Sequence, residues 1–285
     1  MKSKNYFRGL RKLAKSKAEN PPVDDQETIY DVPEGSVLLA DIECVDADGN
    51  IFEQYDRLWV AKDVERNEAG NHISFSSYKA ISHFEKKGWF LPSMALSCNI
   101  LAKLFDKAVR KKPNGSYETI DPKAKAVLDT YKNYSPDCGG RAQNTVIGYG
   151  SCGIIHYPVD SDFPSYGGKR KINSTKTRRI LEFSKDGLHD SKLEDILNGL
   201  NPELTMFLKQ FTGLRDPQKL VDIGRYFGNP AKLWFPWSGN RGKGFKETLS
   251  SWLGCNGDHQ SYYNFILGGY CSLGFGCGAS GAREP

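Results

Sequence analysis

The stretch HFEKKGWFLPSMALSCNILAKL, residues 83–104, carries the strongest fold signal in the chain. A helix is predicted to begin before this stretch and to end within it, because three apolar residues recur at helical spacing: Tyr78, Ile81 and Phe84. Gly88 fits the left-handed end of that helix, and Pro92 fits the first turn of a second helix. A buried stripe is predicted on the second helix, formed by Met94, Leu96, Ile100, Leu101, Leu104, Phe105 and Val109. The sequence therefore predicts two helices joined by a tight corner.

Short apolar runs on both sides of this corner predict strands. SVLLADIEC (36–44) and DRLWVAKD (56–63) are separated by VDADGN, a turn sequence, and AKLWFPW (231–237) and ETLSSWLGC (247–255) follow much later. Between them, Asp121-Pro122, Asn201-Pro202 and Asp216-Pro217 each predict a helix start. The predicted class is α+β, and we expect the first strand, near Val37–Ile42, to lie close to the C-terminal strands.

Length and composition limit the possible domain organisation of the chain. It has 285 residues, a formal net charge of +5 and 39% hydrophobic residues, which is typical of a folded, core-burying protein. Residues 1–30 form a basic arm and a linker, followed by one domain over 31–285. The arm is an amphipathic helix that either packs on its own domain or contacts a membrane surface, nucleic acid or a partner. No secretory signal or transmembrane segment is predicted.

Most motifs that carry chemistry are missing. GNRGKG (239–244) lacks the spacing of a phosphate loop, the five histidines show no paired spacing, and the seven cysteines contain no C-x-x-C pair. We therefore predict no catalytic residues, no metal and no cofactor. The basic run GGKRKINSTKTRR (167–179) fits a solvated loop better than a phosphate-binding surface, so nucleic acid is not the expected partner.

The C-terminal residues differ in composition from the rest of the chain. Between Cys255 and Gly281 there is one charged residue, Asp258, although 26% of the whole chain is charged. The segment is rich in Gly, Tyr, Ser and Asn, residues that are common in antibody binding loops. Lys, Glu, Met and Trp are missing between Cys255 and Arg283, and Gln260 is the single Gln.

Two parts of the chain resemble known families. Residues 83–104 resemble the G-W-x-L-P-[ST] segment of C-type-lectin-fold proteins related to formylglycine-generating enzymes, although Phe90 stands where Arg is common. The C-terminal segment resembles the hypervariable region of variable proteins of diversity-generating retroelements. There, an error-prone reverse transcriptase scrambles adenines of AAC or AAT codons, which cannot yield Lys, Glu, Gln, Met or Trp. GAREP, at the C-terminus, is similar to the fixed ends of such segments.

The resemblance implies a C-type lectin fold with helical insertions and short mixed or antiparallel sheets. It implies an insertion over 110–231 and a variable ligand-binding segment over 252–285. The implied function is calcium-independent binding of a protein ligand on a host or other cell surface, without catalysis. The implied variable positions are Asn256, Asp258, His259, Ser261, Tyr262, Tyr263, Asn264, Ile266, Leu267, Tyr270, Ser272 and Phe275. The implied fixed, buried framework is Trp89, Pro92, Trp234, Trp237 and Trp252.

Other readings of the sequence remain open. Cys271 and Cys277 could act as the copper-binding thiol pair of a formylglycine-generating-enzyme-like oxidase, although no basic residue nearby would lower their pKa. The domain could be a lectin-like binding domain without diversification, or a basic structural protein that binds nucleic acid. The glycine-rich segment could also be ordinary packed β-structure.

Overall fold

The computed structural model describes residues 34–71, 73, 75, 77–132, 141–148, 154–156, 191–200, 202–234, 248–257, 263–270, 279 and 281–285. The chain divides after Val32, and the description below concerns the compact unit Pro33–Pro285. The predicted basic arm lies outside the described residues. Strands and helices follow one another in groups along this unit, and most strand pairs are antiparallel, which confirms the α+β class.

The first layer is a small antiparallel sheet. β1 (Val37–Val45) pairs with β2 (Ile51–Val60), and β11 (Ala282–Arg283) pairs with β2, giving the order β1-β2-β11. In the turn, Asp46 Oδ1 accepts hydrogen bonds of 2.9 Å from the backbone N–H groups of Asp48 and Asn50. Both predicted strands are confirmed. The expectation that the first strand lies close to the C-terminal strands holds only at the level of this sheet, because β11 pairs with β2, and β2 lies between β1 and the end of the chain.

The helix corner forms as predicted, with one shift. α2 (Ser77–Glu85) is followed by a turn that closes at Gly88, which has φ +70°. Trp89 N donates to Phe84 O at 3.0 Å, so the last carbonyls of α2 are satisfied by the turn. α3 (Met94–Ala108) is capped by Ser93, whose Oγ accepts a hydrogen bond from Leu96 N at 3.0 Å. Pro92 therefore precedes the cap instead of lying in the first helical turn.

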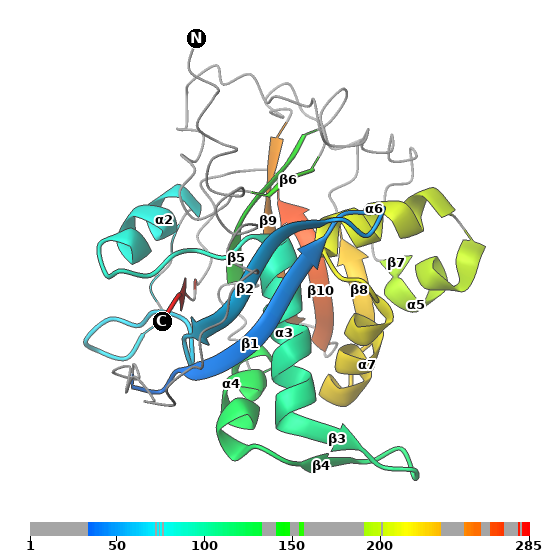
Figure 1. The fold of residues 1–285 in the computed structure, drawn as a ribbon, viewed down its shortest axis with the longest axis horizontal. Helices are drawn as coiled ribbons and strands as arrows, with labels where there is room; N and C mark the ends of the chain where they lie inside the picture. Colours follow the sequence, from blue (N-terminus) through cyan, green and yellow to red (C-terminus); the bar gives the residue numbers. More distant parts are fainter. Residues whose placement is uncertain are drawn as a thin grey trace, which may run out of the picture. The chain divides into compact units, whose positions relative to one another are not determined.

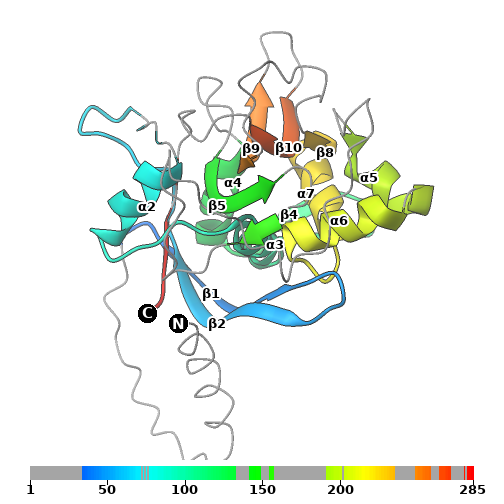
Figure 2. The same ribbon diagram turned by 90° about the horizontal axis from the view of Figure 1, so that it is seen from above.

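α3 is buried on nearly all sides, so the predicted single stripe is too narrow. Twelve of its fifteen residues are buried, including Ser97, Cys98 and Asn99. Figure 2 shows α3 between the β1–β2 hairpin and the β9–β10 pair, and other helices flank it. Asn99 satisfies its amide by donating to Ala95 O at 2.9 Å and Gly213 O at 3.0 Å. A polar residue is tolerated there because its hydrogen bonds are made.

A short hairpin follows α3 and was not predicted. β3 (Val109–Lys111) pairs with β4 (Tyr117–Thr119). Val109 was expected on the helix stripe, but its φ of −141° is extended, and it caps α3 instead. Its side chain is still buried, at 5% exposure. Burial alone therefore does not distinguish the last helical residue from the first strand residue.

The second sheet has six strands. They are β5 (Arg141–Gly148), β6 (Ile154–His156), β7 (Ser191–Lys192), β8 (Ala231–Trp234), β9 (Thr248–Gly257) and β10 (Tyr263–Tyr270). Their order is β6-β5-β9-β10-β8-β7, and Figure 1 shows this sheet beyond α3. β10 pairs antiparallel with β9 and parallel with β8. The predicted strands at 231–237 and 247–255 are therefore confirmed where the structure describes them.

The remaining helices cover the same core. They are α4 (Pro122–Lys132), α5 (Leu193–Asp195), η1 (Ile196–Leu200), α6 (Pro202–Thr212) and α7 (Gln218–Phe227). Asp121 Oδ1 accepts from Lys123 N at 2.9 Å, which confirms that predicted cap. Asp216 Oδ1 accepts from Gln218 N at 3.0 Å, but α7 begins at Gln218 with Pro217 as its N-cap, so this helix starts one residue later than predicted. The predicted cap at Asn201 lies outside the described residues.

Two groups of buried side chains hold the unit together. The larger is centred on α3, and the smaller contains Phe75, Ala80, Phe84, Leu91 and Ala279. Trp89 packs against the smaller group but is half-buried, so the prediction that it lies fully in the core is wrong. Trp59 of β2, which was not predicted, is buried at 7% exposure.

Candidate functional site

The C-terminal segment, predicted as the binding region, supplies the central strands of the six-stranded sheet. β9 lies between β5 and β10, and β10 lies between β9 and β8. Eight consecutive residue pairs join β9 to β10, from Gly257–Tyr263 to Ser250–Tyr270. Because backbone groups make these hydrogen bonds, the pairing does not depend on which side chains the strands carry.

After β10 the chain returns to the other sheet and is fixed there. We call Ala279, Gly281 and Ala282 the C-terminal clasp. Ala282 exchanges two hydrogen bonds with Phe90 of the helix corner, at 2.8 and 2.9 Å. Ala61 N donates to Gly281 O at 3.1 Å, and Glu65 N donates to Ala279 O at 2.9 Å. The segment between β9 and the clasp is therefore anchored at both of its ends.

The clasp requires glycine at position 281. A Cβ atom placed there would lie 2.8 Å from Phe84 Cδ1 and 3.2 Å from Trp89 Cβ. Phe84 is only 1% exposed, so its ring has little room to move away. The GAREP end and the Gly-Trp-Phe-Leu-Pro corner, which the sequence separates widely, thus touch through main chain and side chain.

The predicted variable positions divide into three groups. Asn256, Tyr263, Asn264, Ile266 and Tyr270 lie in β9 or β10, and Asn256 pairs directly with Asn264. Leu267 also lies in β10 but is fully buried, with 0% exposure, opposite Leu253 and Leu233. Its prediction as a solvent-facing position is wrong. Six positions lie outside the described residues: Asp258, His259, Ser261, Tyr262, Ser272 and Phe275.

The predicted framework is described only in part. Pro92 is buried in the helix corner. Trp234 is the last residue of β8, and Trp252 of β9 pairs with Gly268 and Ala142 on its two sides. Trp237 lies outside the described residues. These positions place two of the tryptophans in the sheet that contains the predicted binding segment.

A half-buried carboxyl of β2, that of Glu53, lies beside the start of α3 and was not predicted. Tyr55 Oη donates to Glu53 Oε1 at 2.9 Å, and Ser93 Oγ lies 3.3 Å from Glu53 Oε2. Burial raises the pKa of Glu53 to about 7, although the hydrogen bonds from Tyr55 and Ser93 oppose the shift. Burial, and then the charge of Glu53, raise the pKa of Tyr55. Glu53 is therefore protonated in part of the molecules near neutral pH.

Glu53 makes stability depend on pH. The folded protein holds its proton up to about pH 7, whereas the ordinary value of a glutamate is 4.5. The free energy of unfolding should therefore fall as pH rises between these two values. We expect Glu53→Gln to stabilise the protein at pH 8 by about 2 kcal/mol and to leave stability at pH 4.5 nearly unchanged.

Urea unfolding of both proteins over this pH range measures the effect. Glu118→Gln is the matched control, since Glu118 lies in the exposed β3–β4 hairpin and its pairs with Arg110 and Lys112 are 3.8 and 3.4 Å long. An equal pH slope in the parent and in Glu53→Gln would contradict the assignment.

Two buried cysteines, Cys44 and Cys98, are not placed for catalysis. Cys44 and Cys98 are free and buried. Burial raises the pKa of both thiols, so neither forms the thiolate that a nucleophile requires. Cys271 and Cys277, the thiol pair of the oxidase reading, lie outside the described residues. Among the residues that the structure describes, no group of three His, Cys, Asp or Glu residues is arranged to hold a metal ion.

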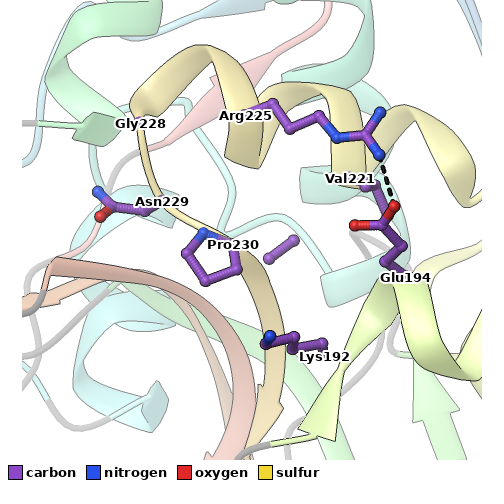
Figure 3. A pocket seen from close by; sticks show the side chains of 8 residues that line it. Lys192, Glu194, Val221, Arg225, Gly228, Asn229 and Pro230 are labelled. Carbon is purple, nitrogen blue, oxygen red and sulfur yellow. Dashed lines mark hydrogen bonds and ion pairs between the residues drawn. The ribbon is translucent and has the colours of Figure 1, made fainter.

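A pocket of about 330 Å³ lies where α7 turns into β8, lined by Lys192, Glu194, Val221, Arg225, Gly228, Asn229, Pro230 and Ala231. Figure 3 shows Arg225 and Glu194 pointing toward each other across one side, with Pro230 near the middle. Their ion pair is 2.6 Å long. Arg225 also lies 3.4 Å from Asp222. The sequence did not reveal this pocket, because residues from β7, α5, α7 and β8 meet only in the folded chain.

Comparison with protein-family models, with curated proteins and with solved structures finds no match for this chain. No helix in the described part of the chain is both long and apolar enough to cross a membrane.

Proposed function

We propose that this protein is a ligand-binding display protein of the C-type-lectin type, whose C-terminal segment is diversified by a retroelement. Its ligand is a protein on a host or other cell surface, bound without catalysis.

The clasp is the observation that carries this proposal. The two stretches that resemble the family, residues 83–104 and the GAREP end, are hydrogen-bonded to each other through Phe90 and Ala282. Such contact is expected if both belong to one conserved scaffold. An unrelated glycine-rich tail would not be expected to form hydrogen bonds with the helix corner.

Anchoring at both ends suits a segment whose side chains change. The backbone pairs of β9 and β10 set its path, and Gly281 and Ala282 fix where it finishes. Side chains that project away from the core can then be replaced at little cost in stability, since surface substitutions usually shift it by no more than about 0.5 kcal/mol. Binding groups held on strands are also more precisely placed than groups on free loops.

Leu267 limits which positions can vary. Successive strand residues lie on opposite faces of a sheet, and Leu267 is buried in the main core. Residues 264, 266 and 270 have the other parity and are assigned to the opposite face. We therefore keep Asn264, Ile266 and Tyr270 as proposed display positions in β10. We remove Leu267, and also Tyr263, which has the same parity as Leu267 in this strand.

A library tests the proposal. The predicted display positions other than Tyr263 and Leu267 are randomised, and the library is displayed on yeast. We expect most members to stay folded, and selection against a panel of purified cell-surface proteins to yield binders. The control library randomises exposed residues of β2, namely Gln54, Asp56 and Arg57. Equal numbers of binders from both libraries, or loss of folding in most members of the first, would contradict the proposal.

A further inference from the structure

The pocket beside α7 adjoins the proposed display segment. Ala231 lines the pocket and begins β8, and it pairs with Phe265 of β10. β8 and β10 run parallel, so the pocket lies at the end of the sheet where β10 starts. Gly257 and Tyr263 pair at that same end, before and after residues 258–262. A ligand that contacts β9 and β10 at Gly257 and Tyr263 would therefore approach the pocket as well.

The walls of the pocket are formed by tightly packed backbone. A Cβ atom at Gly224 would lie 2.7 Å from both Ala231 N and Asn229 O, so α7 and the start of β8 are in direct contact. Gly228 ends α7 with φ +79°, and Asn229 N donates to Gly224 O at 2.9 Å. None of these contacts involves the C-terminal segment. The pocket should therefore keep its shape when that segment changes sequence.

The positive charge at the rim is not fully compensated. Arg225 is paired with Glu194 and Asp222. Lys192 is exposed, and no ion pair within the described residues involves it. It also pairs directly with Lys232 across β7 and β8. Lys192 therefore carries the charge at the rim that no carboxylate of the described residues pairs with.

The floor of the pocket is apolar. Val221 and Ala231 are each 3% exposed, and Pro230 lies beside them. A ligand group that fits both the apolar floor and the charged rim has a short aliphatic stem, which contacts the floor, and an anionic end, which pairs with Lys192. Among protein side chains, aspartate and glutamate have this form.

We propose that this pocket is a fixed subsite that binds an acidic side chain of the protein ligand, with Lys192 as its anion-binding residue. The diversified positions would then determine which protein is bound, and the subsite would add one contact common to many ligands. That the acidic group belongs to a protein rests on the proposed function, whereas the binding of a carboxylate rests on the pocket alone.

The test uses the full chain and N-acetyl-glutamate amide as the probe, followed by amide NMR signals. We expect the signals of Asn229 and Ala231 to shift and saturate with a Kd on the order of 10 mM, as befits a single contact. The neutral analogue N-acetyl-glutamine amide should leave them unmoved. Lys192→Gln should abolish the shifts, and Lys86→Gln, which removes an exposed lysine after α2, should preserve them.

Shifts of equal size with both probes, shifts that persist in Lys192→Gln, or no shifts would each overturn the subsite. The probe presents no protein surface, so this outcome is independent of whether the C-terminal segment is diversified. Probe binding together with a failed display library would retain the subsite and reject the display function. A successful display library without probe binding would retain the display function and reject the subsite.

Discussion

Replacing Leu267 by alanine should lower the free energy of unfolding by about 3 kcal/mol, the usual cost of a large-to-small change in a core. Leu267 has 0% exposure and sits in the main core group, opposite Leu233 of β8. The substitution removes apolar contacts and leaves a cavity that the paired strands on both sides cannot close. Urea unfolding measured by circular dichroism gives the value.

Asn264→Ala is the matched control in the same strand. If Asn264 is a display position, its replacement should change stability by no more than about 0.5 kcal/mol. Leu267→Met, which conserves volume, should cost less than about 1.5 kcal/mol. Equal destabilisation by Leu267→Ala and Asn264→Ala would show that β10 is structural on both faces, which would leave no display surface on that strand.

Replacing Gly281 by valine should destabilise the protein by about 3 kcal/mol, at the upper end of the cost of overpacking. The first atom of any side chain would lie 2.8 Å from the buried Phe84 ring. We expect the clasp to open, because displacing the clasp and the residues that follow it disturbs less structure than displacing the helix corner. Thermal melts give the loss of stability, and faster digestion by carboxypeptidase reports the opening.

Arg283→Ala serves as the control, since Arg283 is exposed in the same strand and its backbone pairing with Trp59 is unaffected. A double-mutant cycle with Phe84→Leu identifies the clash. The two substitutions together should cost less than the sum of their separate costs, because the smaller side chain makes room for valine. Strict additivity, or a harmless Gly281→Val, would show that the clasp is not a close contact.

Local signals were sufficient to predict the helix corner. Gly88 and Ser93 fix the end of α2 and the start of α3 through backbone conformation and one capping hydrogen bond. Both effects depend on residues a few positions apart. The sequence could not show that α3 would be surrounded, because its second buried face packs against strands that lie far away along the chain.

The candidate site was less accessible from sequence. Composition identified the C-terminal segment, but composition does not distinguish Leu267 from Ile266, and only the register with β8 and β9 separates their faces. Glu53 gave no signal because its neighbours Phe52 and Gln54 are exposed, and its burial comes from Tyr55 and the distant Ser93. When a side chain is buried by residues that are distant in sequence, no local sequence pattern predicts that burial.

Sequencing the genomic DNA around the coding region tests the diversification of the C-terminal segment most directly. The account predicts a near-copy of the DNA that encodes residues 252–285, beside a reverse-transcriptase gene. The two copies should differ mainly at adenines, in codons such as those of Asn256, Asn264 and Ile266, and should agree at Leu267 and Gly281. A locus with no such repeat, or a repeat whose differences fall equally on all bases and on the codons of Leu267 and Gly281, would contradict it.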